Sequence, residues 1–121
     1  MSALAETLQN ELGDRVKIFC TSYPQKDFSL LDIVHPAASK GAGVAAAAEE
    51  LGISAMEVMA IGDNLNDLEM LEFAGTAVIM ENAEPMLRKL PGFHVTAGNN
   101  SDGVALAVDR FILSTQETVP E

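Results

Sequence analysis

One stretch of the sequence, residues 58–71 (VMAIGDNLNDLEML), constrains the fold and the function more than any other. It opens with the apolar run Val58–Ile61, which is short and continuous, as expected of a strand that is buried on both faces. Gly62 ends the run. Four polar side chains then follow within five residues, where the strand would pass into a helix: Asp63, Asn64, Asn66 and Asp67. The pattern predicts a polar cluster at the carboxyl end of a buried strand, the edge at which open α/β sheets bind ligands.

The chemistry of this cluster favours a cation and a phosphate group. Its two carboxylates and two amides supply only oxygen ligands and amide donors. Oxygen ligands suit a hard cation such as Mg²⁺, with phosphate oxygens beside it. An EF-hand calcium loop is excluded by spacing, because Leu65 or Leu68 falls where that loop needs an oxygen ligand.

Structural roles stay open for single members of the cluster. Asn66 fits the N-cap of a helix, with Glu69 three residues later as its capping-box partner. Asp63 fits an Asx turn. For any one of these residues taken alone, the structural role is at least as well supported as a role in binding. The four residues together, directly after a buried strand, favour a binding site.

A length of 121 residues is enough for one domain with one core, and 48% apolar and 21% charged residues are typical of a soluble globular protein. The net charge of −11 repels nucleic acid and anionic membranes, so we expect neither as a partner. No apolar run approaches the roughly 20 residues of a membrane helix, and no signal peptide opens the chain, so we expect a cytoplasmic protein. The one cysteine, Cys20, ends an apolar run, which predicts a buried thiol without a disulfide partner.

The first 35 residues are predicted to form one helix and two strands. Leucines at helical spacing predict a helix over residues 2–12. Residues 16–21 and 28–34 are predicted strands, which we expect to pair antiparallel across a turn-rich connection. A proline then interrupts the pattern, and we place a domain boundary after residue 35.

Helices and strands alternate from residue 36 to residue 114. The predicted helices cover residues 39–51 and 65–73, a short segment capped by Asn82, and a last segment from Ser101 or Asp102 to about residue 113. The predicted strands cover residues 58–61, 76–80 and 93–96. This order implies βαβ crossovers and a parallel sheet with helices on both faces. Residues 115–121 are predicted to be a tail.

Lys40 is unusual because it lies in the first turn of a predicted helix, where the helix dipole favours anions. A phosphate shared with the free N–H groups of that turn would explain it. The alternative is a solvated surface lysine, which costs only a few tenths of a kcal/mol. Residue type alone favours this alternative.

Two elements together carry a resemblance: Ser39–Gly41 at a helix start, and the Gly-Asp-x-x-Asn-Asp pattern of residues 62–67. The sequence resembles the haloacid dehalogenase superfamily, and more narrowly its Cof-type sugar-phosphatase branch, over about residues 28–115. The resemblance implies an α/β fold with a mostly parallel, Rossmann-like sheet flanked by helices. It also implies that this core is incomplete and that residues 1–35 are the remnant of an α+β cap domain.

The resemblance implies roles for four side chains. Lys40 would steady the phosphate and the nucleophile, as a catalytic and phosphate-binding residue, which reverses the surface interpretation above. Asp63 would bind Mg²⁺. Asn66 and Asp67 would hold the phosphate and the water shell of the metal, so we expect Asn66 to bind phosphate and Asp67 to belong to the metal site. Phosphoryl transfer needs a metal and a cation placed in advance against the charge that develops on the phosphate oxygens.

The element that begins the family's chemistry is not in this sequence. In the family, the nucleophile and general acid are the two aspartates of an Asp-x-Asp element, and no aspartates here have that spacing. The chain is therefore expected to be the C-terminal part of such an enzyme. In the family fold, the strand that carries the nucleophile lies beside the strand of residues 58–61. Without it that strand is an apolar edge, and we expect a homo-oligomer formed through it.

Two functions follow from these residues. The first is the C-terminal portion of a Mg²⁺-dependent phosphatase that hydrolyses small phosphorylated metabolites, such as sugar phosphates, through an aspartyl-phosphate. The isolated chain is then expected to be inactive, because its nucleophile is absent. The alternative is a non-catalytic module, either an oligomerising remnant or a subunit that completes another chain. This alternative explains the missing strands. It gives no role to Lys40 and the cluster of residues 63–67, which would then only be retained from an ancestral enzyme.

Overall fold

The computed structural model describes residues 2–114, and the predicted tail of residues 115–121 lies outside the described part. The chain divides into two compact units, Met1–Ser39 and Lys40–Glu121. None of the described helices is both long enough and apolar enough to cross a membrane.

The first unit contains the predicted helix and the predicted pair of strands. Helix α1 covers Ser2–Leu12, and strands β1 (Lys17–Tyr23) and β2 (Phe28–Val34) pair antiparallel. The rings of Tyr23 and Phe28 stack at the closed end of the hairpin, with their centroids 4.9 Å apart. The antiparallel pair is therefore confirmed, with β1 extending two residues beyond its predicted end.

The prediction of a buried thiol is wrong, because Cys20 is exposed. Cys20 lies in β1, opposite Leu31 of β2, in a sheet of only two strands. A two-stranded sheet offers little area for burial, and an apolar run in it is not covered on both faces as in a larger sheet.

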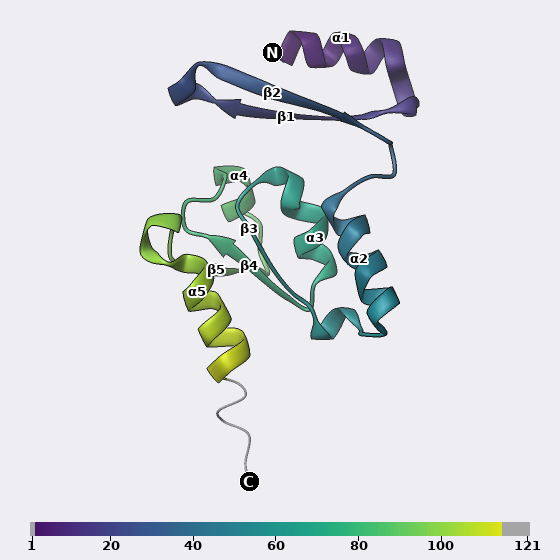
Figure 1. Ribbon diagram of the computed structural model, residues 1–121. Coiled ribbons are helices and arrows are strands. Elements are labelled where there is room, and N and C mark those ends of the chain that lie inside the picture. The colour runs from purple at the N-terminus through teal and green to yellow at the C-terminus, as the bar shows by residue number, and fades with distance from the viewer. Residues whose placement is uncertain (1, 115–121) are drawn as a thin grey trace. The chain divides into compact units, whose positions relative to one another are not determined.

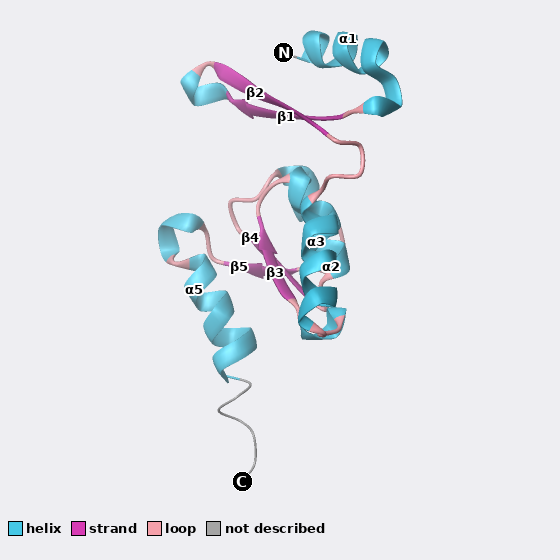
Figure 2. Cartoon of the chain, turned by 45° about the vertical axis from the view of Figure 1, so that its right-hand side comes forward, coloured by secondary structure: helices cyan, strands magenta, loops and turns pink. Residues whose placement is uncertain are grey.

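The second unit is an α/β layer structure, as predicted. Its strands form one parallel sheet in the order β3-β4-β5, and its helices lie on both faces (Figures 1 and 2). Helix α3 packs on one face against β3 and β4 with α2 packed beside it on α3, and α5 packs on the other face against β4 and β5. The elements are α2 (Lys40–Leu51), β3 (Met59–Gly62), α3 (Leu68–Phe73), β4 (Thr76–Met80), α4 (Pro85–Arg88), β5 (His94–Thr96) and α5 (Gly103–Val108).

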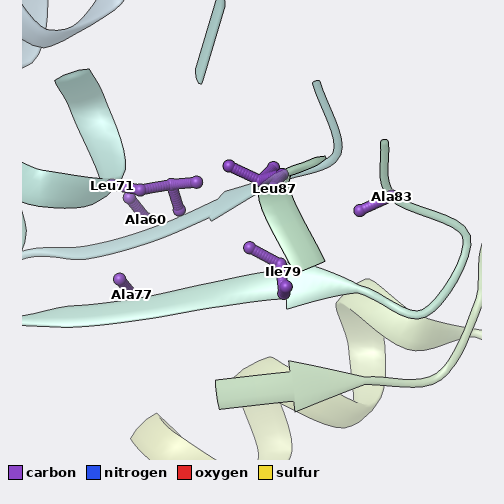
Figure 3. Close-up of a cluster of buried hydrophobic side chains, with 6 residues drawn as sticks. All are labelled: Ala60, Leu71, Ala77, Ile79, Ala83 and Leu87. Carbon is purple, nitrogen blue, oxygen red and sulfur yellow. The ribbon is translucent and has the colours of Figure 1, made fainter. Parts of the chain in front are cut away.

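The core lies between the sheet and the helices α3 and α4. Six buried side chains form its centre, and Figure 3 shows them converging from the sheet, the helices and the β4–α4 loop: Ala60, Leu71, Ala77, Ile79, Ala83 and Leu87. The parallel register places Ala60 of β3 beside Ala77 of β4, so both point toward α3. The small alanines allow helix and sheet to approach closely.

Of two predicted helix caps, one is wrong and the other is confirmed in position only. Helix α4 begins at Pro85 with Glu84 as its N-cap residue, so Asn82 does not cap it. Asp102 occupies the N-cap position of α5, but it has a left-handed backbone (φ 58°) and no capping hydrogen bond from its side chain. After α5, the chain continues as π-helical turns over Asp109–Leu113.

Candidate functional site

The site is built around Asp67, whose side chain folds back onto the loop that follows β3. Its Oδ2 accepts hydrogen bonds from the backbone N–H groups of Asp63 (2.9 Å) and Asn64 (3.1 Å). Asp67 is only 4% exposed. A carboxylate that satisfies two backbone donors holds this loop in one shape.

The loop is also capped from its own start. The Oδ1 of Asn64 accepts from the N–H of Leu65 (2.9 Å) and caps a short 3₁₀ turn over Leu65–Asp67. Asn66 lies inside this turn, so the open alternative that Asn66 is the N-cap is wrong. Asn64 has the capping role instead, and Asn66 is left to project its amide toward Lys40.

Gly62 has no side chain because Asp67 occupies the space. A Cβ built at Gly62 would lie 2.6 Å from the Cβ of Asp67 and 2.7 Å from its Oδ2. Both distances are shorter than van der Waals contact. The Gly-Asp pair at the end of β3 therefore has a packing cause: Gly62, the last residue of the strand, leaves room for the carboxylate that organises the loop.

Lys40 reaches the loop from the start of α2. Its Nζ lies 2.6 Å from Oδ1 of Asp67 and 3.4 Å from Oδ1 of Asn66. The side chain of Lys40 is 53% exposed, whereas that of Asp67 is 6% exposed. Helices α2 and α3 approach closely here, since a Cβ at Gly41 would lie 2.7 Å from the backbone carbonyl carbon of Glu69. The close approach lets one lysine touch the loop and still face solvent.

The pKa of Asp67 is set by opposing causes. Burial raises this pKa. The hydrogen bond from Lys40, the two backbone N–H donors and the positive charge of Lys40 lower it, and together they outweigh the effect of burial. The net effect is a pKa below the usual value of an aspartate. Asp67 is therefore ionised at neutral pH, and it pairs with the cation beside it.

Asp63 presents the free carboxylate of the site. Its side chain is exposed, and within the described residues no hydrogen bond or ion pair engages it. Its backbone is fixed at both polar groups, because its N–H donates to Asp67 and its C=O accepts from the N–H of Glu84 (2.9 Å). An anchored backbone with a free carboxylate suits a cation ligand.

The described residues contain no group of three or more His, Cys, Asp or Glu side chains that could enclose a metal ion. They fit Mg²⁺ in another way, because Mg²⁺ keeps several waters and uses one or two carboxylates. Asp63 offers one free carboxylate. Both oxygens of Asp67 already accept hydrogen bonds.

The structure brings all four predicted site residues together. Asp63, Asn66 and Asp67 lie in one loop, and Lys40 reaches Asn66 and Asp67 from the start of α2. Sequence reasoning missed the link of this loop to Glu84. No local pattern marks that link, because it joins the backbones of two separate loops.

A comparison of the sequence with known families identifies the family of the chain. The model of the haloacid dehalogenase-like hydrolases matches residues 1–108. The chain belongs to this family. The implied superfamily and its α/β fold are thus confirmed for this haloacid dehalogenase-like chain.

Known relatives of the family agree in sequence and in fold. The chain is 37% identical over 109 residues to the phosphoglycolate phosphatase of Methanothermobacter thermautotrophicus, covering 89% of this chain and 46% of that protein. A haloacid dehalogenase-like hydrolase from Bacteroides thetaiotaomicron superposes with a TM-score of 0.75 at 32% identity, covering 92% of this chain and 40% of the other. BT1666 from the same organism, described among the phosphatases of the superfamily, superposes with a TM-score of 0.71 at 28% identity, over 89% and 38%. The chain therefore spans less than half the length of these relatives.

Proposed function

We propose that this chain supplies the phosphate-binding and Mg²⁺-binding part of a phosphatase that acts on small phosphorylated metabolites. Lys40 and Asn66 bind the phosphate in this proposal, and Asp63 with Asp67 forms the metal site. One observation carries it: the ammonium of Lys40 lies 2.6 Å from the carboxylate of Asp67, in the same loop as the free carboxylate of Asp63. The named phosphatases among its relatives support the reaction class.

Each residue has a distinct part in this proposal. Lys40 is half exposed, so its ammonium can face a phosphate oxygen while Asp67 holds it in place. Asn66 has an amide nitrogen whose N–H groups can donate to phosphate, since its Oδ1 faces Lys40. Asp63 would hold Mg²⁺ directly, and Asp67 would contribute through the water shell. When bound, Mg²⁺ supplies the charge that stabilises the negative oxygens of the transferring phosphoryl group.

The nucleophile of the reaction lies outside this sequence in our proposal, because no Asp-x-Asp pattern occurs among the 121 residues. The chain alone therefore binds but does not turn over. We expect phosphatase activity near background for the purified chain, with or without Mg²⁺. Robust hydrolysis by a clean preparation that survives Asp63→Ala would contradict the assignment of Asp63 to the site and point to a contaminant.

Binding tests the proposal without turnover. Mg²⁺ and inorganic phosphate are titrated separately into the ¹⁵N-labelled chain, and backbone amide shifts are followed by NMR. Mg²⁺ is expected to shift Asp63 and Asn64, and phosphate to shift Lys40 and Asn66. Asp63→Asn should abolish the response to Mg²⁺, and Lys40→Ala should abolish the response to phosphate.

Matched variants control for the change in net charge. Asp109→Asn and Lys89→Ala make the same charge changes at exposed positions of the same unit. They should leave both responses intact. Equal losses in the control and site variants would mean that the ions respond only to overall charge, and the proposed site would be rejected.

A second candidate function is self-association, and it is favoured by the place of β3 at the edge of the described sheet. The strand Met59–Gly62 carries no charged residue and no proline, the features with which proteins protect sheet edges. Sedimentation velocity at micromolar concentration tests this candidate. A dimer or larger species is expected, and a strictly monomeric profile would reject it.

A further inference from the structure

A hydrogen-bonded tie joins three loops at the carboxyl edge of the parallel sheet. The first loop follows β3 and contains Asp63, the second follows β4 and contains Asn82, and the third follows β5 and contains Asn99. The Oδ1 of Asn82 accepts from the N–H of Asn99 (2.9 Å). The N–H of Glu84 donates to the C=O of Asp63 (2.9 Å). The β4–α4 loop is thus bonded to a loop on either side.

The β4–α4 loop is held in place between its bond to Asn99 and its bond to Asp63. The N–H of Glu81 donates to the C=O of Thr96 (2.9 Å), which continues the sheet ladder past the end of β4. Ala83, only 4% exposed, inserts into the hydrophobic core between Asn82 and Glu84. Residues 81–84 are hydrogen-bonded at both ends and anchored by the buried side chain of Ala83. A shift of this segment at Asn82 is therefore passed on to Glu84 and not absorbed within the loop.

The third loop is equally constrained. Its N–H groups at Ser101 (3.0 Å) and Gly103 (3.2 Å) both donate to the C=O of Gly98, and the hydroxyl of Thr96 donates to the C=O of Gly103 (2.7 Å). Within the described residues, the side chain of Asn82 makes the hydrogen bond that joins this tight loop to the β4–α4 loop. The bond also orients the amide, since only Oδ1 can accept from an N–H donor.

We propose that Asn82 is a positioning residue for Asp63. By holding the β5–α5 loop against the β4–α4 loop, it fixes the backbone segment whose Glu84 N–H holds the carbonyl of Asp63. The placement of the Asp63 carboxylate then depends on a side chain that does not touch it. This inference deepens the proposed cation site and rests on it for the part that concerns Mg²⁺.

The experiment removes the hydrogen bond from either side in the full chain. Asn82→Leu keeps the branching and the number of heavy atoms but removes the acceptor, whereas Asn82→Asp keeps an acceptor at the same place. Asn99→Pro removes the donor. Gly98 has φ −70° and ψ 172°, the extended conformation that a residue before proline prefers. Asn100→Leu, at the next and exposed position, is the matched control.

The first readout needs no metal. Asn82→Leu is expected to speed hydrogen exchange of the Asn99 amide about tenfold, and to shift the amide resonances of Glu84, Asp63 and Asn64. Asn99→Pro should reproduce the shifts at those three amides. Asn82→Asp should restore the wild-type exchange of Asn99, and Asn100→Leu should change none of these values.

The second readout is the dissociation constant for Mg²⁺ from the same spectra. It should rise about tenfold in Asn82→Leu, the size expected when a supporting partner of a metal ligand is removed. It should rise likewise in Asn99→Pro and stay unchanged in Asn100→Leu.

The outcomes separate the two proposals. A wild-type chain that shows no response to Mg²⁺ rejects the cation site, while the metal-free shifts still decide whether Asn82 positions Asp63. Positioning by Asn82 is overturned if Asn82→Leu speeds hydrogen exchange of the Asn99 amide but leaves the amide resonances of Glu84 and Asp63 unshifted, as the control Asn100→Leu does. It is also overturned if Asn82→Asp behaves as Asn82→Leu. If Asn82→Leu does not fold, Asn99→Pro gives the answer from the donor side.

Discussion

The Nζ of Lys40 and the Oδ1 of Asp67 lie 2.6 Å apart and join the first residue of α2 to the loop after β3. The other oxygen of the same carboxylate accepts from two backbone N–H groups. Asp67 therefore connects the cation of the site to the backbone of the site. Its ionised state is the condition for both contacts.

This condition predicts a loss of stability in acid. Because the pKa of Asp67 is lowered in the folded chain, its contribution is fully present above the unfolded value of about 3.9 and is lost as pH falls through the folded value. Asp67→Asn should be less stable than wild type at pH 7, by about 1–3 kcal/mol. The difference should shrink below pH 4. Urea unfolding between pH 7 and pH 2.5 measures it, with Asp109→Asn as the control that should parallel wild type.

Lys40→Met should raise the pKa of Asp67, because both the ammonium hydrogen bond and its charge are removed while burial stays. A ¹³C NMR titration of the aspartate carboxyl groups measures the pKa directly. Lys40→Arg keeps the charge and should raise the value less than Lys40→Met. An unchanged titration in Lys40→Met would contradict the contact between the two side chains.

Gly41→Ala should destabilise the second unit by about 1–3 kcal/mol, the usual range for overpacking. The added Cβ would lie 2.7 Å from the backbone carbonyl carbon of Glu69, and a backbone atom yields less readily than a side-chain end. Gly43→Ala is the matched control in the same helix, since nothing lies within 4 Å of its Cβ. It should stabilise by about 0.5–1 kcal/mol, because alanine favours the helix. Equal effects in urea unfolding would contradict the close packing of α2 on α3.

Gly62→Ala should displace the carboxylate of Asp67 without removing it, because the new methyl group would lie only 2.6 Å from its Cβ and 2.7 Å from its Oδ2. The N–H groups of Asp63 and Asn64 then lose their acceptor. Their amide protons should move upfield and exchange faster, while amides in β1 and β2 stay unchanged. Retained protection at both positions would mean that the loop has another way to accommodate a side chain.

Mg²⁺ should stabilise the chain by mass action if Asp63 binds it. At a free concentration ten times the dissociation constant, the expected gain is about 1.4 kcal/mol. Urea unfolding with MgCl₂ or with EDTA measures the gain. Asp63→Asn should abolish it and Asp109→Asn should keep it. NaCl at the same ionic strength controls for screening of the net charge of −11.

The sequence predicted those parts of the molecule that depend on neighbours along the chain. The strand before Gly62, the loop up to Asp67 and the turn between β1 and β2 are local, so apolar runs and turn residues located them. Lys40, at the start of α2, is predicted as a site residue only through the resemblance, since its residue type alone favours a surface role.

Contacts between distant segments could not be predicted in the same way. Asn82 has the residue type and the place of a helix cap, but its partner is the backbone of Asn99, 17 positions away. The exposure of Cys20 depends on how many strands and helices cover its sheet, which an apolar run does not reveal. In both cases the local pattern is compatible with two outcomes: Asn82 can cap a helix or bond a distant loop, and Cys20 can be buried or exposed. Tertiary packing determines which one occurs.

The 27 positions that separate Lys40 from Asp67 have a consequence for the lifetime of a bound ligand. The segment between them contains all of α2 and β3, so the two charges meet only while α2 is docked on α3. Whenever the first turn of α2 opens, Lys40 leaves with it. If Lys40 binds an anion as proposed, the anion loses this contact each time the turn opens, so the opening rate sets an upper bound on its residence time.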